Sequence, residues 1–208
     1  MRMTTAMPHP LRRLRTPALL ALGALSLSAC VGFVGKAPPF LLTLDADVAP
    51  VVGEARSAGE AQTLTILIPN APQKLRTTRI PVQQDDASVA YVKDAQWVEA
   101  PQRLFQRLLS ETVAAKTPLV VLDEGQYLTA PGEQLASQLL EFGVDARTNE
   151  AVVSLQAMRV AAGGKTVTQR RFEVREPIGG KIEAKPVGEA LTRAANKVAA
   201  DVAAWLAG

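Results

Sequence analysis

An apolar stretch that ends in the only cysteine of the chain limits how much of this sequence can fold. The segment Leu27-Ser28-Ala29-Cys30 closes the apolar run 18–25, and Arg12, Arg13 and Arg15 precede that run. A basic segment, a short apolar segment and small residues before a cleavage point are typical of a secretory signal peptide. A cysteine directly after Leu-Ser-Ala narrows this pattern to the lipobox of bacterial lipoproteins. The alternatives are an ordinary signal peptide with a coincidental cysteine, or a core helix.

The lipobox divides the chain into three predicted segments. Residues 1–29 are the lipoprotein signal peptide, Cys30 is the lipidation site, and residues 30–39 form a lipidated tether in which Gly and Pro break regular structure. Removal of 29 of the 208 residues leaves 179, of which residues 40–208 are predicted to form one domain. That length is enough to bury a core of ordinary size.

Cleavage would also change the charge of the chain. The signal peptide holds four of the 23 basic residues and none of the 20 acidic residues, so 19 basic residues remain against 20 acidic ones. A nucleic-acid-binding protein keeps a basic patch, and we therefore expect no nucleic-acid partner. No second apolar run reaches the 18 residues that suggest a membrane-spanning helix, so lipid is the predicted anchor.

The counts of histidine and cysteine exclude several classes of chemistry. The only histidine, His9, lies in the signal peptide, and the only cysteine, Cys30, is assigned to lipid. A mature chain without either side chain cannot build a Ser-His-Asp triad, a Cys-His dyad or a zinc site with nitrogen and sulfur ligands. We therefore expect a protein that is not an enzyme and that has no cofactor and no metal. A carboxylate-based periplasmic hydrolase is the enzymatic alternative.

The hydrophobic pattern predicts a single α/β domain with a mixed, mostly antiparallel sheet, long C-terminal strands and two main helices packed on it. Strands are expected at 40–44, 63–68, 79–83, 88–92, 119–122, 140–147, 151–160 and 166–174, and helices from Pro101 to Ala115 and from near Pro186 onward. Pro81 cannot donate to a strand ladder, so its strand should be irregular or at an edge. The wholly apolar Leu119–Leu122 predicts burial on both faces.

Turn residues separate the predicted strands. Gln84-Asp85-Asp86 and Arg147-Thr148-Asn149-Glu150 have turn chemistry. Gly163-Gly164 is typical of a hairpin. The three long strands from Gln134 to Glu176 are therefore expected to form an antiparallel meander.

The order of these features resembles the ABC-type transport auxiliary lipoproteins, which accompany Mce-domain lipid transporters such as the Pqi system. The specific part of the resemblance is Trp97-Val98-Glu99-Ala100-Pro101, which opens an amphipathic helix, and Arg171-Phe172 in the last strand is a weaker match. The sequence departs from the family at Pro69–Arg76, because the family commonly has a Tyr here and this chain has none.

The resemblance implies a function in the cell envelope. It implies a non-enzymatic, membrane-anchored subunit of an Mce-type ABC lipid transport system, whose partners are an Mce-domain protein with its permease and ATPase, and it allows a homo-oligomer. The alternative is a structural lipoprotein of another assembly pathway, for outer-membrane proteins or lipopolysaccharide. Val31 follows the lipidated cysteine where Asp would favour retention at the inner membrane. This predicts the periplasmic face of the outer membrane.

Three residues are candidates for contact with a partner. Trp97 is next to a helix start, where a Trp usually packs in the core; the alternative is an anchor at an interface. Arg170 and Arg171 would usually form a solvated strand face, and the alternative is a contact with anionic lipid headgroups or an acidic partner.

Overall fold

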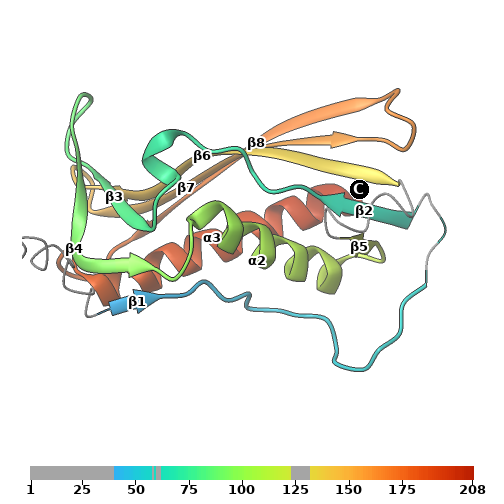
Figure 1. Cartoon of the computed structure of the whole chain (residues 1–208), viewed down its shortest axis with the longest axis horizontal. Coiled ribbons are helices and arrows are strands. Elements are labelled where there is room, and N and C mark those ends of the chain that lie inside the picture. Colours follow the sequence, from blue (N-terminus) through green and yellow to red (C-terminus); the bar gives the residue numbers. More distant parts are fainter. Residues whose placement is uncertain (1–39, 58, 60–61, 123–131) are drawn as a thin grey trace, which may run out of the picture. The chain divides into compact units, whose positions relative to one another are not determined.

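The computed structural model of this chain describes residues 40–57, 59, 62–122 and 132–208. The predicted signal peptide, Cys30 and the tether lie outside these residues. The described part is a single α/β domain with an eight-stranded mixed sheet and two long helices, which confirms the expected fold class (Figure 1). Neither of these helices is both long enough and apolar enough to cross a membrane.

The elements follow the predicted order, and several strands are longer than the pattern indicated. They are β1 (Phe40–Leu42), β2 (Thr63–Ile66), the 3-10 helix η3 (Gln73–Leu75), β3 (Arg79–Gln83), β4 (Val89–Trp97), α2 (Pro101–Lys116), β5 (Val120–Leu122), β6 (Glu133–Asp145), β7 (Glu150–Val160), β8 (Val167–Pro177) and α3 (Ala184–Ala207). Strand β4 continues past residue 92, and it passes through Asp94, which has a left-handed φ of 55°. This irregularity breaks the alternation that marks a strand in sequence.

Strand β6 is the centre of the sheet because two strands share one of its edges. Along the other edge β6 pairs with β7 in antiparallel orientation, and β7 pairs with β8 in the same way. On the shared edge β2 pairs in parallel with the start of β6, Leu64 opposite Glu133, while β3 pairs in parallel with its end, Val82 opposite Val144. Between them the Asn70 N–H donates to the Ser137 carbonyl at 2.9 Å. The chain from β2 to β3 therefore follows β6.

The remaining strands extend the sheet outward. Strand β4 pairs with β3 in antiparallel orientation, β1 pairs with β4 in parallel, and β5 pairs with β2 in parallel. Among the described residues the edges of the sheet are therefore β1, β5 and β8. The meander from β6 to β8, predicted from alternation and turns, is confirmed.

Pro81 lies in an irregular strand, as predicted, but not in an edge strand. Strand β3 is between β4 and β6, and its ladder to β4 shifts register between Arg79 and Pro81. The ladder to β6 begins only at Val82, so the missing N–H of Pro81 interrupts neither ladder. Pro81 packs closely against β6 at Gly143. A Cβ atom at Gly143 would lie 2.5 Å from the Pro81 carbonyl oxygen, so this position requires glycine.

The prediction that Leu119–Leu122 is buried on both faces is wrong. Strand β5 pairs with β2 at the edge of the sheet, and its three residues are only half-buried. A short apolar run has the same appearance whether both of its faces are covered or one edge is open.

Both helices pack on one face of the sheet (Figure 1). α3 contacts β7 and β8, and α2 contacts α3. The aromatic centre of the core is Phe142, whose ring meets Trp97 edge-on at 5.6 Å and Phe105 at 6.3 Å between centroids. Asn196 on α3 holds the segment after β1, because its Oδ1 accepts from the Asp47 N–H at 2.8 Å.

Candidate functional site

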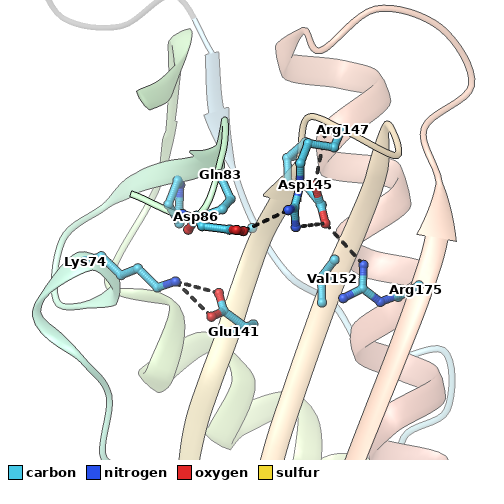
Figure 2. A pocket seen from close by; sticks show the side chains of 11 residues that line it. Lys74, Gln83, Asp86, Glu141, Asp145, Arg147, Val152 and Arg175 are labelled. Atoms are coloured by element: carbon cyan, nitrogen blue, oxygen red, sulfur yellow. Dashed lines mark hydrogen bonds and ion pairs between the residues drawn. The ribbon is translucent and has the colours of Figure 1, made fainter. Parts of the chain in front are cut away.

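The face of the sheet opposite the helices, called here the open face, carries a pocket of about 380 Å³ (Figure 2). Phe142 and Val144 of β6 are buried, so the residues that alternate with them, Glu141, Gly143 and Asp145, lie on the open face. The pocket is lined by Lys74, Pro81, Gln83, Asp86, Glu141, Gly143, Val144, Asp145, Arg147, Val152 and Arg175. Most of these side chains are charged. The lining residues come from η3, β3, β6, β7 and β8 and from the turns after β3 and β6.

Asp145, at the end of β6, is the buried centre of the charged group. Its Oδ1 accepts hydrogen bonds from the Arg147 backbone N–H at 3.1 Å and from Arg147 Nε at 3.2 Å. Its Oδ2 accepts from an Arg147 terminal nitrogen at 3.3 Å and from Arg175 at 3.4 Å. Arg147 also donates to Asp86 at 2.9 Å, which joins the turn between β3 and β4 to the turn after β6 (Figure 2). One carboxylate thus holds two guanidinium groups.

A second ion pair closes the pocket on the η3 side. Lys74 Nζ donates to both carboxylate oxygens of Glu141, at 2.9 and 2.7 Å (Figure 2). Lys74 lies on η3. This short helix is held beside β6 because the strands before and after it, β2 and β3, both pair with the same edge of β6. The bidentate contact fixes the η3 segment over the open face.

The network continues across the sheet to the edge strand β8. Arg175 donates from Nε to Glu173 at 3.2 Å and lies 3.6 Å from Glu150. Arg171 donates to the other Glu173 oxygen at 3.2 Å and to Ser154 Oγ at 3.3 Å. Acidic and basic side chains therefore alternate from the end of β6 to the exposed edge of the sheet.

These contacts keep two carboxylates ionised. Hydrogen bonds from the Arg147 side chain lower the pKa of Asp145 below its usual value, with a further contribution from Arg175. Partial burial raises the pKa of Glu173, but hydrogen bonds with Ser154, Arg175 and Arg171 outweigh it and leave that pKa lowered. Neither carboxyl group can donate a proton near neutral pH, so the arrangement suits rigid charge display better than general acid catalysis.

Asp145→Asn should destabilise the domain at neutral pH, by about 1–2 kcal/mol for the lost charge-assisted hydrogen bonds. Because the folded-state pKa of Asp145 is lowered, the contribution of its carboxylate is complete above the unfolded-state pKa and is lost as pH falls through the folded-state pKa. The difference between the wild type and the variant should therefore shrink in acid. Urea denaturation at pH 7 and pH 3 measures it.

Asp86→Asn is the matched control, because the Asp86 side chain pairs with the same arginine but is 94% exposed. Exposed ion pairs contribute little to stability, so this variant should match the wild type at both values of pH. Equal losses for the two variants would contradict the assignment of Asp145 as the buried centre.

The structure separates the three residues predicted to contact a partner. Trp97 is 1% exposed and packs against Phe142, as the core alternative expected. A partner could reach its ring only by displacing core side chains, so the folded domain does not present Trp97 at its surface. Arg170 and Arg171 are both exposed on β8 but point to opposite faces. Arg171 joins the network on the open face, whereas Arg170 lies over the Phe172 ring at 5.2 Å on the helix side.

The charged network was missed from sequence because its members are far apart in the chain and each resembles an ordinary solvated residue. One signal was available. The alternation that predicted β6 also placed Glu141, Gly143 and Asp145 on a common face. The partners Lys74 and Arg175 come from elements whose pairing with the meander the sequence did not specify.

A comparison with protein families identifies the chain. The sequence model of the family described as the ABC-type transport auxiliary lipoprotein component matches residues 43–203, which is most of the domain. This chain belongs to that family. The auxiliary lipoprotein has no match among the curated proteins.

Two solved structures share the fold of this auxiliary lipoprotein. Protein XCC0632 from Xanthomonas campestris is 16% identical, with a TM-score of 0.68 over 80% of this chain and 94% of that one. A crystal structure titled as an uncharacterized protein is 13% identical, with a TM-score of 0.61 over 79% of this chain and 99% of that one. At these identities the likeness concerns the fold alone. The family assignment makes the chain a lipoprotein component of ABC-type transport.

Proposed function

We propose that this auxiliary lipoprotein is a non-enzymatic subunit of an Mce-type ABC lipid transport system of the cell envelope. Lipid on Cys30 anchors it, and the folded domain docks on an Mce-domain protein that works with a permease and an ATPase. The observation that carries the proposal is the family match over residues 43–203. The segments 1–29, 30–39 and 40–208 keep their predicted roles as signal peptide, tether and domain.

The exposed edge of β8 supports a docking role. Strand β8 pairs only with β7 among the described strands, so its outer edge has unpaired backbone groups. Three exposed guanidinium groups lie beside that edge, Arg170 on the helix side and Arg171 and Arg175 on the open face. Backbone groups that can pair with a strand and charges that fix its register suit the addition of a partner strand.

Charge reversal at Arg170 and Arg171 tests this docking surface. The double variant Arg170→Glu/Arg171→Glu should weaken binding to the Mce-domain protein by about tenfold or more, because complementary charges at an interface become repulsive. Folding should change little, since both side chains are exposed. Binding is measured with the lipidated protein in detergent, and circular dichroism checks the fold.

Arg103→Glu is the matched control, because Arg103 is an equally charged and exposed residue on α2. It should leave binding unchanged. If the folded wild type binds no Mce-domain protein but co-purifies with an outer-membrane protein or lipopolysaccharide assembly complex, the alternative envelope function replaces the one proposed. Turnover of a periplasmic substrate by the purified protein would favour an enzyme.

Sorting to the outer membrane is expected from Val31, the residue after the lipidated cysteine. In a density gradient the wild type should sediment with outer-membrane markers, and Val31→Asp should move a large part of it to the inner-membrane fraction. A wild-type protein that sediments wholly with inner-membrane markers would disprove this localisation.

A further inference from the structure

The edge of the sheet at β1 leaves apolar side chains exposed where the described chain begins. Phe40 is 52% exposed, Leu41 is 63% exposed and Val98 is 52% exposed. Leu41 is paired with Gln96, and the Val98 N–H donates to the Leu42 carbonyl at 2.9 Å. Leu41 and Val98 therefore lie on one face of this edge and Phe40 lies on the other. We call these three residues the β1 edge.

The fold does not need the β1 edge for its core. Leu42 already packs toward α3, where a Cβ atom on Gly188 would lie 3.1 Å from it, and Leu44 is buried. Strand β1 pairs only with β4, so none of the described strands lies along its outer side. Three large apolar side chains thus remain in contact with water at one end of the sheet, which is costly unless something covers them.

The chain that precedes β1 indicates what covers this edge. Nine residues, 31–39, separate Cys30 from Phe40. Ten Cα–Cα steps span at most about 35 Å even when fully extended. If Cys30 carries lipid, as the proposed function requires, the β1 edge can never be further than this from the bilayer that holds the lipid.

We propose that the β1 edge lies on the surface of the anchoring bilayer, with Phe40, Leu41 and Val98 inserted among the lipid headgroups. Aromatic and aliphatic side chains are suited to that depth. Two acidic groups near the edge have basic partners: Glu99 is paired with Arg107 at 3.3 Å, and Asp94 lies 3.9 Å from Lys93 Nζ. These pairs reduce the negative charge that would face anionic lipid.

This orientation leaves the docking surface free. The strands run in the order β1, β4, β3, β6, β7 and β8, so the β1 edge and β8 are at opposite ends of the sheet (Figure 1). A domain held to lipid at β1 presents β8 away from that contact.

Single fluorescent probes on the full-length lipidated protein test the contact. Cys30 is the only cysteine and has no free thiol when lipidated, so Leu41→Cys and Val167→Cys each provide one site for an environment-sensitive dye. Val167 is the matched control, because it is apolar, 53% exposed and located on β8. In vesicles of phosphatidylethanolamine and phosphatidylglycerol in equal parts, nitroxide-labelled lipid should quench the dye at position 41 about twofold more strongly than the dye at position 167. Adding Phe40→Ser should reduce that quenching.

The outcomes separate this inference from the function on which it rests. If the wild-type protein itself takes up the dye, Cys30 has a free thiol, and both the lipid anchor and this inference fail. If the wild type takes up no dye and positions 41 and 167 are quenched equally, the anchor stands and the bilayer contact is disproved. If the dye at position 41 reports an apolar environment that depends on protein concentration and is not quenched by nitroxide lipid, the β1 edge contacts a second copy of the chain and the proposal is overturned.

Discussion

We expect Cys30→Ser to leave this auxiliary lipoprotein without its lipid anchor, either unprocessed or in a soluble form. The change removes the sulfur to which lipid would be attached in the segment Leu27-Ser28-Ala29-Cys30. A single acyl chain binds membrane weakly and reversibly, whereas several chains hold stably, and the lipoprotein pathway adds three. The fraction of the protein that carries lipid should therefore fall from nearly all to a small part. Fractionation and intact-mass measurement follow the two changes.

Ser28→Ala is the control for Cys30→Ser, because it alters the same segment but keeps a small residue before the cysteine. It should be processed and anchored as the wild type is. A Cys30→Ser protein that still matured and sedimented with membranes would show that something other than lipid on this cysteine holds the protein there.

The largest loss of stability is expected from Trp97→Ala. The Trp97 ring is almost fully buried and packs against Phe142, so its removal leaves a cavity in the centre of the core. Such changes cost about 3–5 kcal/mol. The free energy of unfolding of a domain is usually about 5–15 kcal/mol, so this loss is a large part of it. Urea denaturation of the purified variant should show a clearly lower midpoint at an unchanged slope.

Trp97→Phe is the informative companion. It keeps a ring against Phe142 and removes an indole N–H that is buried without a hydrogen-bond partner among the described residues. Its cost should therefore be much smaller than that of Trp97→Ala. If Trp97→Phe folded normally but lost binding to the Mce-domain protein, Trp97 would act at the partner surface after all.

The elements of the fold could be predicted from sequence because each leaves a local pattern. The stripe after Pro101 marks α2, and Gly163-Gly164 marks the hairpin between β7 and β8, where both glycines have positive φ. Pairing between distant strands leaves no such pattern. The internal position of the Pro81 strand, the edge position of β5 and the irregular end of β4 at Asp94 all follow from neighbours that the sequence pattern does not name.

The candidate site was harder to predict than the fold for a related reason. Asp145 is a common residue before a turn, and only its burial between Arg147 and Arg175 gives it a particular role. Lys74 reaches Glu141 because η3 lies between two strands that share one edge of β6. The exposed β1 edge was hidden in the same way, since a short apolar strand predicts burial unless its position at the sheet edge is known.

The double use of one edge of β6 has a consequence for the order in which the domain can form. Strands β2 and β3 precede β6 in the chain, yet both need its edge for their parallel pairing. β2 ends at Ile66 and β6 begins at Glu133, so at about 5–20 residues per second a chain made from its amino end waits several seconds between them. During that interval β2, whose four residues are all buried in the folded domain, has no β6 edge to pair with. The sheet of the auxiliary lipoprotein therefore stays incomplete until the chain from Glu133 onward is available. Until then the unpaired edge of β2 is open to a chaperone.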